Sequence, residues 1–370
     1  MMFDRRELLR TGASAVALAA APAAAWAQAP SPELFAPTPG AWRTYELTTK
    51  VELLDPQGET QAWLPIPAFE GEGWIKPGET TFQTKGKAAI VQDPKSGARL
   101  LHVAWAANEP QPEITATSRF TARDHKVDTS KSDPSIKLSP ELRARYTAST
   151  STLRLQGIVT ETATKITAGA ANDLDKARRI YEWIVDNTTR NPKTRGCGTG
   201  DIESMLKSGN LTGKCADLNA LYVGLARASN LPARDIYGIR VAPSAFGYKS
   251  LGAGTATITR AQHCRADVFV DGIGWIPVDP ADVRKVVLEE PPGALAIDDP
   301  KVKAARAALF GSWETNWLAY NDTHDVVLPG SKGPPVSFLM YPQAETGRGR
   351  LDELDPDAFK YTITTRQLPA

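Results

Sequence analysis

The chain has 370 residues, and its 43 lysine and arginine residues almost balance its 42 aspartate and glutamate residues. The resulting net charge of +1 argues against a nucleic-acid-binding protein that relies on phosphate contacts. Hydrophobic residues make up 42% of the chain, which excludes an intrinsically disordered protein, and three cysteines are too few to stabilise a fold of this length by disulfides.

The N-terminal residues have the features of an export signal. Arg5 and Arg6 precede an alanine-rich stretch that ends in Ala25-Trp26-Ala27, a small-residue pattern that fits signal peptidase. Because paired arginines are typical of the twin-arginine route, we expect residues 1–27 to be a twin-arginine signal peptide and the mature protein to be periplasmic or secreted. An ordinary secretory signal or an uncleaved anchor is the alternative. No membrane span is expected after signal removal, since no later apolar run approaches the roughly 20 residues that a membrane helix needs.

A β-rich domain is expected next. Residues 28–39 are rich in proline and alanine, which is typical of a linker. Over residues 40–128, short alternating segments are separated by breaks with proline and glycine, and this pattern predicts an N-terminal β-sandwich domain. The expected strands are Tyr45–Leu53, Ala98–Trp105 and Glu113–Phe120. This region contains no catalytic constellation.

Helical periodicity begins after Ser139-Pro140, a typical helix start, and we expect the core domain to span residues 135–330. Asp175–Val185 places its apolar side chains on one face, which predicts an amphipathic helix. Val336–Met340 and Tyr361–Thr364 are expected to form closing strands. Residues 331–370 are therefore expected to pack back on the fold.

The sequence gives little support to a metal or nucleotide site. The four histidines are scattered, and neither C-x-x-C nor H-E-x-x-H spacing is present. Asp322–Asp325 could bind a cation, but we expect this segment to be a solvated loop. Gly209–Cys215 only superficially resembles a phosphate-binding loop, because Cys215 stands where serine or threonine would bind magnesium. No metal and no cofactor are therefore expected.

Cys215 is a candidate nucleophile, because it stands at the start of a predicted helix. A helix N-terminus favours the thiolate over the thiol, and Lys214 adds a nearby positive charge. Gly213 is expected to let an acyl substrate approach the sulfur. The alternative is a buried cysteine that serves only as a small hydrophobic residue. The apolar side chains of the predicted helix are Leu218, Leu221, Tyr222 and Leu225.

His263 and Asp279 stand on the two strands of a predicted hairpin whose turn is Asp271-Gly272. A two-residue loop would set His263 against Pro280. A three-residue loop would set Asp279 against Arg265, on the same face as His263. An aspartate and a histidine placed in this way can orient and activate a cysteine nucleophile. The alternative is an ordinary surface histidine and an unrelated turn aspartate.

Together these elements resemble the transglutaminase-like superfamily, which comprises cysteine enzymes with a papain-type core. The similarity covers about residues 140–290. It departs from the family pattern at Asn230 (for Gly), Arg265 (for Trp) and Asp267 (for Glu). The motifs that carry it are Gly213-Lys214-Cys215 for G-x-C, Asn230-Leu231-Pro232-Ala233-Arg234 for G-I-P-A-R, His263-Cys264-Arg265-Ala266-Asp267-Val268 for H-x-W-x-E-V, and Gly272–Pro280 for G-x-G-W-x-x-x-D-P.

The resemblance implies an α+β fold in which a papain-like transglutaminase core, with the nucleophile helix packed on an antiparallel sheet, follows the β-sandwich domain. It implies a catalytic triad of Cys215, His263 and Asp279 that works without a cofactor or metal. The expected enzyme forms a thioester from a carboxamide or peptide carbonyl and passes it to water or to an amine. Its expected partner is a protein or peptide substrate in the cell envelope.

Two alternatives to this enzyme remain. One is a catalytically inactive envelope scaffold or binding protein with a relic triad. The other is a plain cysteine protease, which differs in acceptor and substrate.

The two remaining cysteines also leave two possibilities. Cys197 and Cys264 either form a disulfide, which would leave Cys215 as the free thiol, or stay buried as free thiols.

Overall fold

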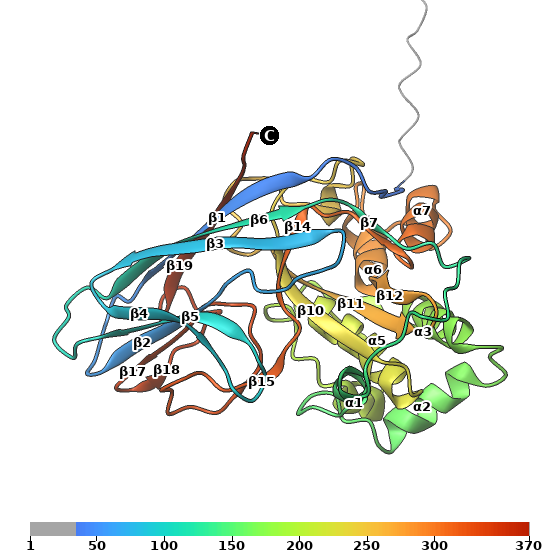
Figure 1. Ribbon diagram of the computed structural model, residues 1–370, viewed down its shortest axis with the longest axis horizontal. Coiled ribbons are helices and arrows are strands. Elements are labelled where there is room, and N and C mark those ends of the chain that lie inside the picture. The colour runs from blue at the N-terminus through green and yellow to red at the C-terminus, as the bar shows by residue number, and fades with distance from the viewer. Residues whose placement is uncertain (1–34, 370) are drawn as a thin grey trace, which may run out of the picture. The chain divides into compact units, whose positions relative to one another are not determined.

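Two antiparallel β-sheets form a sandwich in the computed structural model, which describes residues 35–369 (Figure 1). The expected signal peptide, residues 1–27, and most of the expected linker lie outside the described residues. The first sheet has the order β19-β1-β6-β3, and the second has the order β18-β17-β2-β5-β4. The three strands expected in this region are present as β1, β5 and β6, with small differences at their ends.

The strand bounds of the first sheet are β1 (Arg43–Glu52), β3 (Ile75–Thr84), β6 (Glu113–Ala122) and β19 (Lys360–Gln367). Those of the second sheet are β2 (Thr60–Pro65), β4 (Lys87–Gln92), β5 (Arg99–Trp105), β17 (Gln343–Thr346) and β18 (Gly349–Arg350).

The alternating sequence explains how the sandwich is packed. Along β6, buried and more exposed residues alternate, because successive side chains of a strand point to opposite faces. The inward-facing side chains of both sheets form one hydrophobic core, which includes Val51, Leu64, Val103 and Ile114. This burial stabilises the sandwich by the usual hydrophobic contribution of about 25 cal/mol per Å² of apolar surface.

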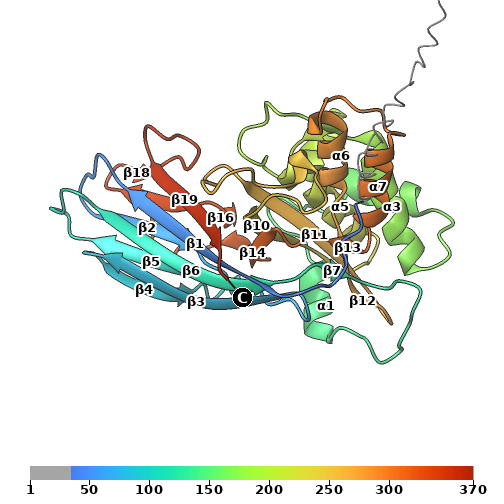
Figure 2. The same ribbon diagram turned by 90° about the horizontal axis from the view of Figure 1, so that it is seen from above.

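Strands from the C-terminal part of the chain complete both sheets. β19 pairs with β1 along its whole length, and β17 pairs with β2. Figures 1 and 2 show these red strands beside the blue strands of the N-terminal region. Arg366 on β19 binds Glu46 on β1 through an Nε–Oε1 hydrogen bond of 2.8 Å, although 320 residues separate them in the chain.

The central part of the chain forms a third antiparallel sheet, separate from the sandwich, with the order β12-β11-β10-β14. Helix α5 packs against β10 and β11, and α2 and α3 pack against α5. In Figure 2 the helices α3, α5, α6 and α7 gather at the end of the molecule away from the sandwich. The strand bounds are β10 (Ala233–Arg240), β11 (Gln262–Val270), β12 (Gly274–Val278) and β14 (Trp317–Asn321).

The helices are α1 (Pro140–Thr147), α2 (Ile158–Thr167), α3 (Asp173–Asn187), α4 (Ile202–Ser208), α5 (Cys215–Ala228), α6 (Pro280–Glu289) and α7 (Pro300–Ala308), with a 3₁₀ turn at Lys249–Leu251. The short strand pairs are β7 (His125–Lys126) with β13 (Ser312–Trp313), β8 (Thr189–Arg190) with β9 (Thr212–Gly213), and β15 (His324–Val326) with β16 (Val336–Phe338).

The predicted helix patterns are confirmed. Helix α1 begins at Pro140 with Ser139 as its N-cap, and the predicted apolar face of α3 is buried. Helix α5 is buried along almost all of its length, which is expected of a helix enclosed between a sheet and other helices. The observed architecture is therefore an antiparallel core sheet with helix α5 packed on it, preceded by a β-rich region. Within residues 35–369, none of the helices has both the length and the hydropathy that a bilayer-spanning segment requires.

Candidate active site

Cys215 is the first residue of α5, as the sequence predicts. Lys214 is the N-cap, and its backbone N–H donates to the Asp217 carboxylate at 3.1 Å. The other oxygen of Asp217 accepts hydrogen bonds from the N–H groups of Thr199 and Gly200, at 2.9 and 3.0 Å. Asp217 thus fixes the start of the helix to the preceding loop. Because Cys215 lies in the first turn, the positive end of the helix dipole favours its thiolate form.

The reason for glycine at position 213 differs from the predicted one. A Cβ atom at Gly213 would lie 2.5 Å from both Cβ and Oδ2 of Asp217. Glycine at this position therefore makes room for the Asp217 side chain that caps the helix. The same carboxylate would lie 1.9 Å from a Cβ atom at Gly198. The prediction that Gly213 leaves space for a substrate is wrong, because a protein side chain fills that space.

The hairpin between β11 and β12 has the three-residue loop. Val270 pairs with Gly274, and Ala266 pairs with Val278. This register continues towards Arg265 and Asp279, and Arg265 Nε lies 3.5 Å from Asp279 Oδ2. The two-residue alternative, which set His263 against Pro280, is excluded by this pairing. Asp279 then leaves the strand as the N-cap of α6.

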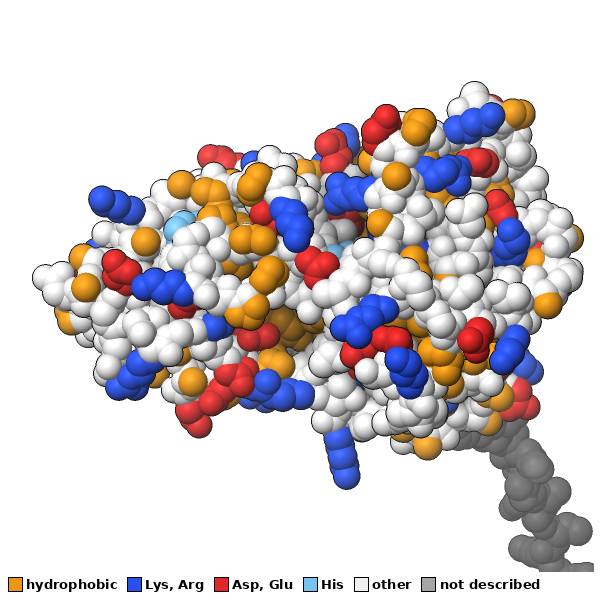
Figure 3. Space-filling view, turned by 90° about the horizontal axis from the view of Figure 1, so that it is seen from below, with side chains coloured by type: hydrophobic (Ala, Val, Ile, Leu, Met, Phe, Trp, Pro, Cys, Tyr) orange, Lys and Arg blue, Asp and Glu red, His pale blue; other side chains and the backbone are white. Residues whose placement is uncertain are grey.

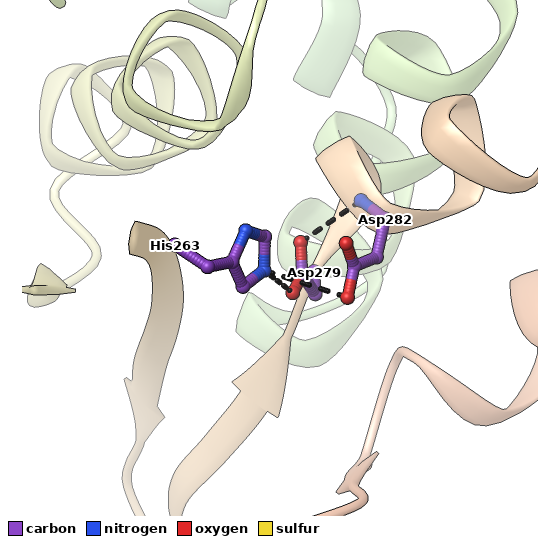
Figure 4. A group of neighbouring side chains, drawn as sticks. All are labelled: His263, Asp279 and Asp282. Atoms are coloured by element: carbon purple, nitrogen blue, oxygen red, sulfur yellow. Dashed lines mark hydrogen bonds and ion pairs between the residues drawn. The ribbon is translucent and has the colours of Figure 1, made fainter. Parts of the chain in front are cut away.

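His263 and Asp279 are in direct contact. His263 Nε2 donates to Asp279 Oδ2 at 2.7 Å, and both side chains are buried. Figure 4 shows the imidazole of His263 pointing at the two carboxylates of Asp279 and Asp282. Asp282 Oδ2 lies 3.4 Å from the same Nε2 atom. The histidine therefore faces two acidic groups, of which the sequence analysis identified one.

Two other side chains that the sequence analysis missed hold the acidic groups in place. Asn219 of α5 donates through Nδ2 to Asp279 Oδ1 at 3.1 Å and to the carbonyl oxygen of Cys264 at 2.8 Å. Arg240 of β10 donates to Asp282 Oδ1 at 2.5 Å. The sequence does contain a signal for Asp282, because it lies three residues after Asp279. Residues with this spacing at the start of a helix lie on the same side of it. Asn219 lies four residues after Cys215, so the same rule applies to it.

The charge state of His263 is determined by these neighbours. Burial and the positive charge of Arg240 oppose a charged imidazole, but the carboxylates of Asp282 and Asp279 outweigh them and raise the pKa of His263 to about 9. Burial also opposes ionisation of Asp282, but the Arg240 guanidinium holds the pKa of that carboxyl well below its usual value. Asp282 therefore supplies a fixed negative charge beside the imidazole.

All three cysteines of the chain lie in one buried cluster around the start of α5. They are free thiols, so the structure corresponds to the second of the two cysteine alternatives. The neighbouring Cys197 and Cys264 thiols, together with the nearby His263, lower the pKa of Cys215 well below its usual value despite burial. The pKa of Cys197, whose thiol donates to the carbonyl oxygen of Gln262 at 3.4 Å, is raised chiefly by the neighbouring Cys215. At neutral pH this arrangement favours a thiolate at Cys215 and an imidazolium at His263.

Cys215 and His263 both line a cavity of about 630 Å³. Two neighbours of Cys215 also line the cavity: Lys214, which precedes it in the chain, and Cys197, which lies in the same buried cluster. The loop of residues 252–262 forms part of its wall. Another part comes from the C-terminal segment around Leu354 and Tyr361, which belongs to the region that completes the sandwich. The cavity therefore gives a ligand access to the sulfur between the helical part of the molecule and its C-terminal strands.

His263, Asp279 and Asp282 are also the one group of metal-ligating type found among residues 35–369. Their surroundings do not fit a divalent cation. Arg240 already binds Asp282, and Arg265 lies beside Asp279, so two guanidinium groups supply the positive charge that these carboxylates need. A cation at this place would meet strong repulsion from both arginines. The group is better explained as the environment of a charged histidine.

The motif positions that depart from the family pattern have structural explanations. Asn230 has a φ of 63°, a left-handed conformation that glycine adopts freely and asparagine tolerates better than most residues. Asp267 is bound by Arg234, its register partner on β10, through hydrogen bonds of 2.8 and 3.1 Å. Arg265 donates to the carbonyl oxygen of Glu314 at 2.8 Å. Neither Arg265 nor Asp267 lines the cavity.

The segment Asp322–Asp325 is not the solvated loop that we expected. The side chains of Asp322 and His324 are 13% and 7% exposed. Asp322 accepts hydrogen bonds from Tyr146 Oη at 2.7 Å and from Arg145 at 3.2 Å. Burial also lowers the pKa of His324 to about 3, so this imidazole is neutral. Asp322 is therefore explained by ion pairs inside the fold, and Asp325 accepts a hydrogen bond from the backbone N–H of Ser151 at 3.0 Å.

Comparison with known proteins gives a family, a relative in sequence and several solved structures with a distant likeness. Residues 160–280 match the model of the family described as "Transglutaminase-like superfamily". An uncharacterized protein of Haemophilus influenzae is 34% identical over 343 residues, which cover 88% of this chain and 91% of that protein.

Solved structures resemble the chain more distantly. A protein of Cytophaga hutchinsonii, provisionally assigned as a cysteine protease, has a TM-score of 0.49 at 14% identity, with 89% of this chain and 99% of that chain covered. The periplasmic domain of TgpA from Pseudomonas aeruginosa has a TM-score of 0.33 at 17% identity, with coverages of 65% and 88%.

Proposed function

The chain belongs to the transglutaminase-like superfamily, and we propose that it is a cysteine-dependent acyltransferase or amidase with Cys215 as nucleophile, His263 as acid and base, and Asp279 as the orienting carboxylate. The observation that carries this proposal is the hydrogen bond of 2.7 Å between His263 and Asp279, on a histidine that lines the same cavity as Cys215. Because Asp279 occupies Nε2 of His263, Nδ1 remains for the sulfur. This is the arrangement that a thiol nucleophile needs.

The first half of the proposed reaction forms a thioester. The thiolate of Cys215 attacks the carbonyl carbon of a carboxamide, and a carbon–sulfur bond forms. The backbone N–H of Cys215, which has no acceptor among the described residues, is in place to stabilise the developing oxyanion, whereas the N–H groups of Ala216 and Asp217 already donate to backbone carbonyls. When the carbon–nitrogen bond breaks, the imidazolium of His263 gives its proton to the leaving amine.

The second half transfers the acyl group. Neutral His263 takes a proton from water or from an amine as that acceptor attacks the thioester carbonyl. The carbon–sulfur bond then breaks, and Cys215 leaves as a thiolate beside the newly charged imidazolium. With water the product is a carboxylic acid, and with an amine it is a new amide. The charges of the resting site are restored in both cases.

We also propose that the protein acts outside the cytoplasm, on a protein or peptide of the cell envelope. Residues 1–27 support this proposal through their paired arginines and their alanine-rich stretch, which are typical of a twin-arginine signal. The reaction fits such a compartment, because the proposed steps need neither ATP nor a diffusible cofactor.

Selective alkylation tests the proposed nucleophile. We expect iodoacetamide at neutral pH to modify Cys215 much faster than Cys197 or Cys264, as mapped by mass spectrometry of the intact and digested protein. Cys197 is a stringent internal control, because it lines the same cavity but its pKa is raised. The variant His263→Ala should slow the reaction at Cys215. His102→Ala, on β5 of the sandwich, should leave it unchanged.

The same experiment separates the enzyme from an inactive scaffold. Equal, slow modification of all three cysteines would support a scaffold with a relic triad. If Cys215 is selectively modified, incubation with a glutamine-containing peptide, with and without an added amine, identifies the acceptor. Ammonia release without amine incorporation indicates an amidase, incorporation indicates an acyltransferase, and cleavage of the peptide chain indicates a protease.

A further inference from the structure

The cavity at Cys215 is lined by more positive than negative side chains. Its basic residues are Arg190, Arg195, Lys214, Arg240, Arg260 and Lys285, and its acidic residues are Glu289 and Glu353. The whole chain has a net charge of only +1, so this excess is local. Figure 3 shows positive and negative side chains interspersed over one face of the molecule. A concave site of one charge concentrates the electric field and attracts ligands of the opposite charge.

Most of the basic groups in the lining are already neutralised by carboxylates of the protein. These ion pairs are Arg190–Glu289, Lys285–Glu289, Arg240–Asp282 and Arg195–Asp352. Groups held in such pairs have lost much of their capacity to bind a ligand carboxylate, because they already have a partner.

Lys214 and Arg260 are the exceptions. Among residues 35–369, neither has a carboxylate oxygen within 4.0 Å. Lys214 directly precedes the nucleophile, and Arg260 lies three residues before His263, on the loop that leads into β11. The two free cations are thus attached to the two elements that carry the proposed reacting groups. Glu353 also lacks a basic partner in the described part of the chain, but it offsets only one of them.

We propose that the acyl donor of this enzyme is anionic: a peptide or small amide that carries a carboxylate close to the reacting carbonyl, bound by Lys214 and Arg260. This inference rests on the proposed function, because it concerns the substrate of the same site. The carboxylate is either an acidic side chain or a free C-terminus, since both present the same two oxygens to the two cations. A neutral or cationic amide would leave Lys214 and Arg260 without a carboxylate partner in the cavity.

Two alkylating reagents of nearly the same size test the proposal. Iodoacetate carries a carboxylate, and iodoacetamide carries a neutral amide in its place. The measured quantity is the rate constant of iodoacetate at Cys215 divided by that of iodoacetamide. This ratio is then normalised by the same ratio measured with 2-mercaptoethanol. Because both reagents attack the same thiolate, this ratio is independent of how much thiolate each variant contains. We expect a ratio above one that falls as ionic strength rises.

Substitution of the two cations makes the test specific. Lys214→Gln and Arg260→Gln should each lower the normalised ratio by about three- to fivefold, the value of a partly exposed ion pair. Lys165→Gln, on the exposed surface of α2, should leave the ratio unchanged. Thermal unfolding of each variant verifies that it is folded.

The outcomes distinguish this inference from the proposed function. If Cys215 reacts selectively with iodoacetamide but the ratio is insensitive to both substitutions, the anionic donor is wrong and the cysteine enzyme stands. If neither reagent modifies Cys215 selectively, the proposed function itself fails. When the ratio falls as expected, glutamine peptides with an acidic side chain, or with a free rather than amidated C-terminus, identify which carboxylate is bound.

Discussion

Asp282 Oδ2 lies 3.4 Å from the same nitrogen of His263 that donates to Asp279 at 2.7 Å. The two carboxylates have different surroundings. Arg240 binds Asp282 and keeps it ionised, whereas Asp279 caps α6 and accepts from Asn219. We infer that Asp279 orients the imidazole and that Asp282 maintains its positive charge.

Substitution of the two aspartates should therefore have different effects. Asp279→Asn removes the negative charge that orients His263 and replaces one acceptor oxygen by an NH₂ donor, and we expect acyl transfer to a glutamine peptide to fall by about 10²- to 10⁴-fold. Asp282→Asn should reduce the rate less and instead lower the pKa of His263. The pH dependence of the rate measures both effects. Equal losses with unchanged pH profiles would contradict the division of roles.

The pH profile of the unmodified protein follows from the charges of the site. The pKa of Cys215 is well below its usual value, so the rate of iodoacetamide labelling should already be at its plateau near pH 7. His263 is protonated below its pKa of about 9. Acyl transfer, which needs that proton for the leaving amine, should therefore decline as the pH rises through about 9. A labelling midpoint near the ordinary thiol pKa would rule out the ion pair.

The neighbouring thiols should control the reactivity of Cys215. Cys197→Ala removes a neighbouring thiol that lowers the pKa of Cys215, so the labelling midpoint of Cys215 should rise by about one pH unit, which corresponds to roughly 1.4 kcal/mol. Cys197→Ser retains a donor and should restore most of the loss. A purely structural role for Cys197 predicts that both variants behave alike, and thermal unfolding controls for packing.

Gly213→Ala should destabilise the protein, because its Cβ would overlap with Asp217. We expect a loss of about 1–3 kcal/mol in the free energy of unfolding, as for other overpacked sites. Gly254→Ala is the matched control, since nothing lies within 4 Å of a Cβ atom there. Urea denaturation compares the two variants, and equal stabilities would show that Asp217 can move away at little cost.

The ion pair between Arg234 and Asp267 should be important for stability, because both side chains are nearly inaccessible. Arg234→Met leaves a buried carboxylate without a partner, and we expect a loss of about 3–5 kcal/mol. Arg348→Met removes a pair with Asp55 in which both side chains are more than half exposed, and its cost should be below about 1 kcal/mol. Urea denaturation of the two variants provides the measurement.

Local rules were enough to predict much of the fold. The start of α5 at Cys215 follows from the apolar periodicity behind it, and the sequence restricted the hairpin between His263 and Asp279 to two registers. These predictions depend on interactions between residues close together in the chain. The structure selects the register that brings Asp279 to the face of His263.

Features that depend on distant residues could not be predicted. Arg240 reaches Asp282 because β10 lies beside β11, and pairing of separate strands is not encoded in their spacing. The role of Gly213 also depends on where the Asp217 side chain turns. Likewise, alternation predicts that β19 is a strand but does not identify β1 as its neighbour, since many strands share that pattern.

The completion of both sandwich sheets by β17, β18 and β19 has a consequence for biosynthesis. A ribosome must release nearly the whole polypeptide before β1 can meet β19, so the first strands made are among the last to be fully paired. Their unpaired edges are exposed to aggregation during that interval. Premature termination anywhere before residue 343 would thus leave the earliest-made sheets open and would remove one wall of the cavity at the same time.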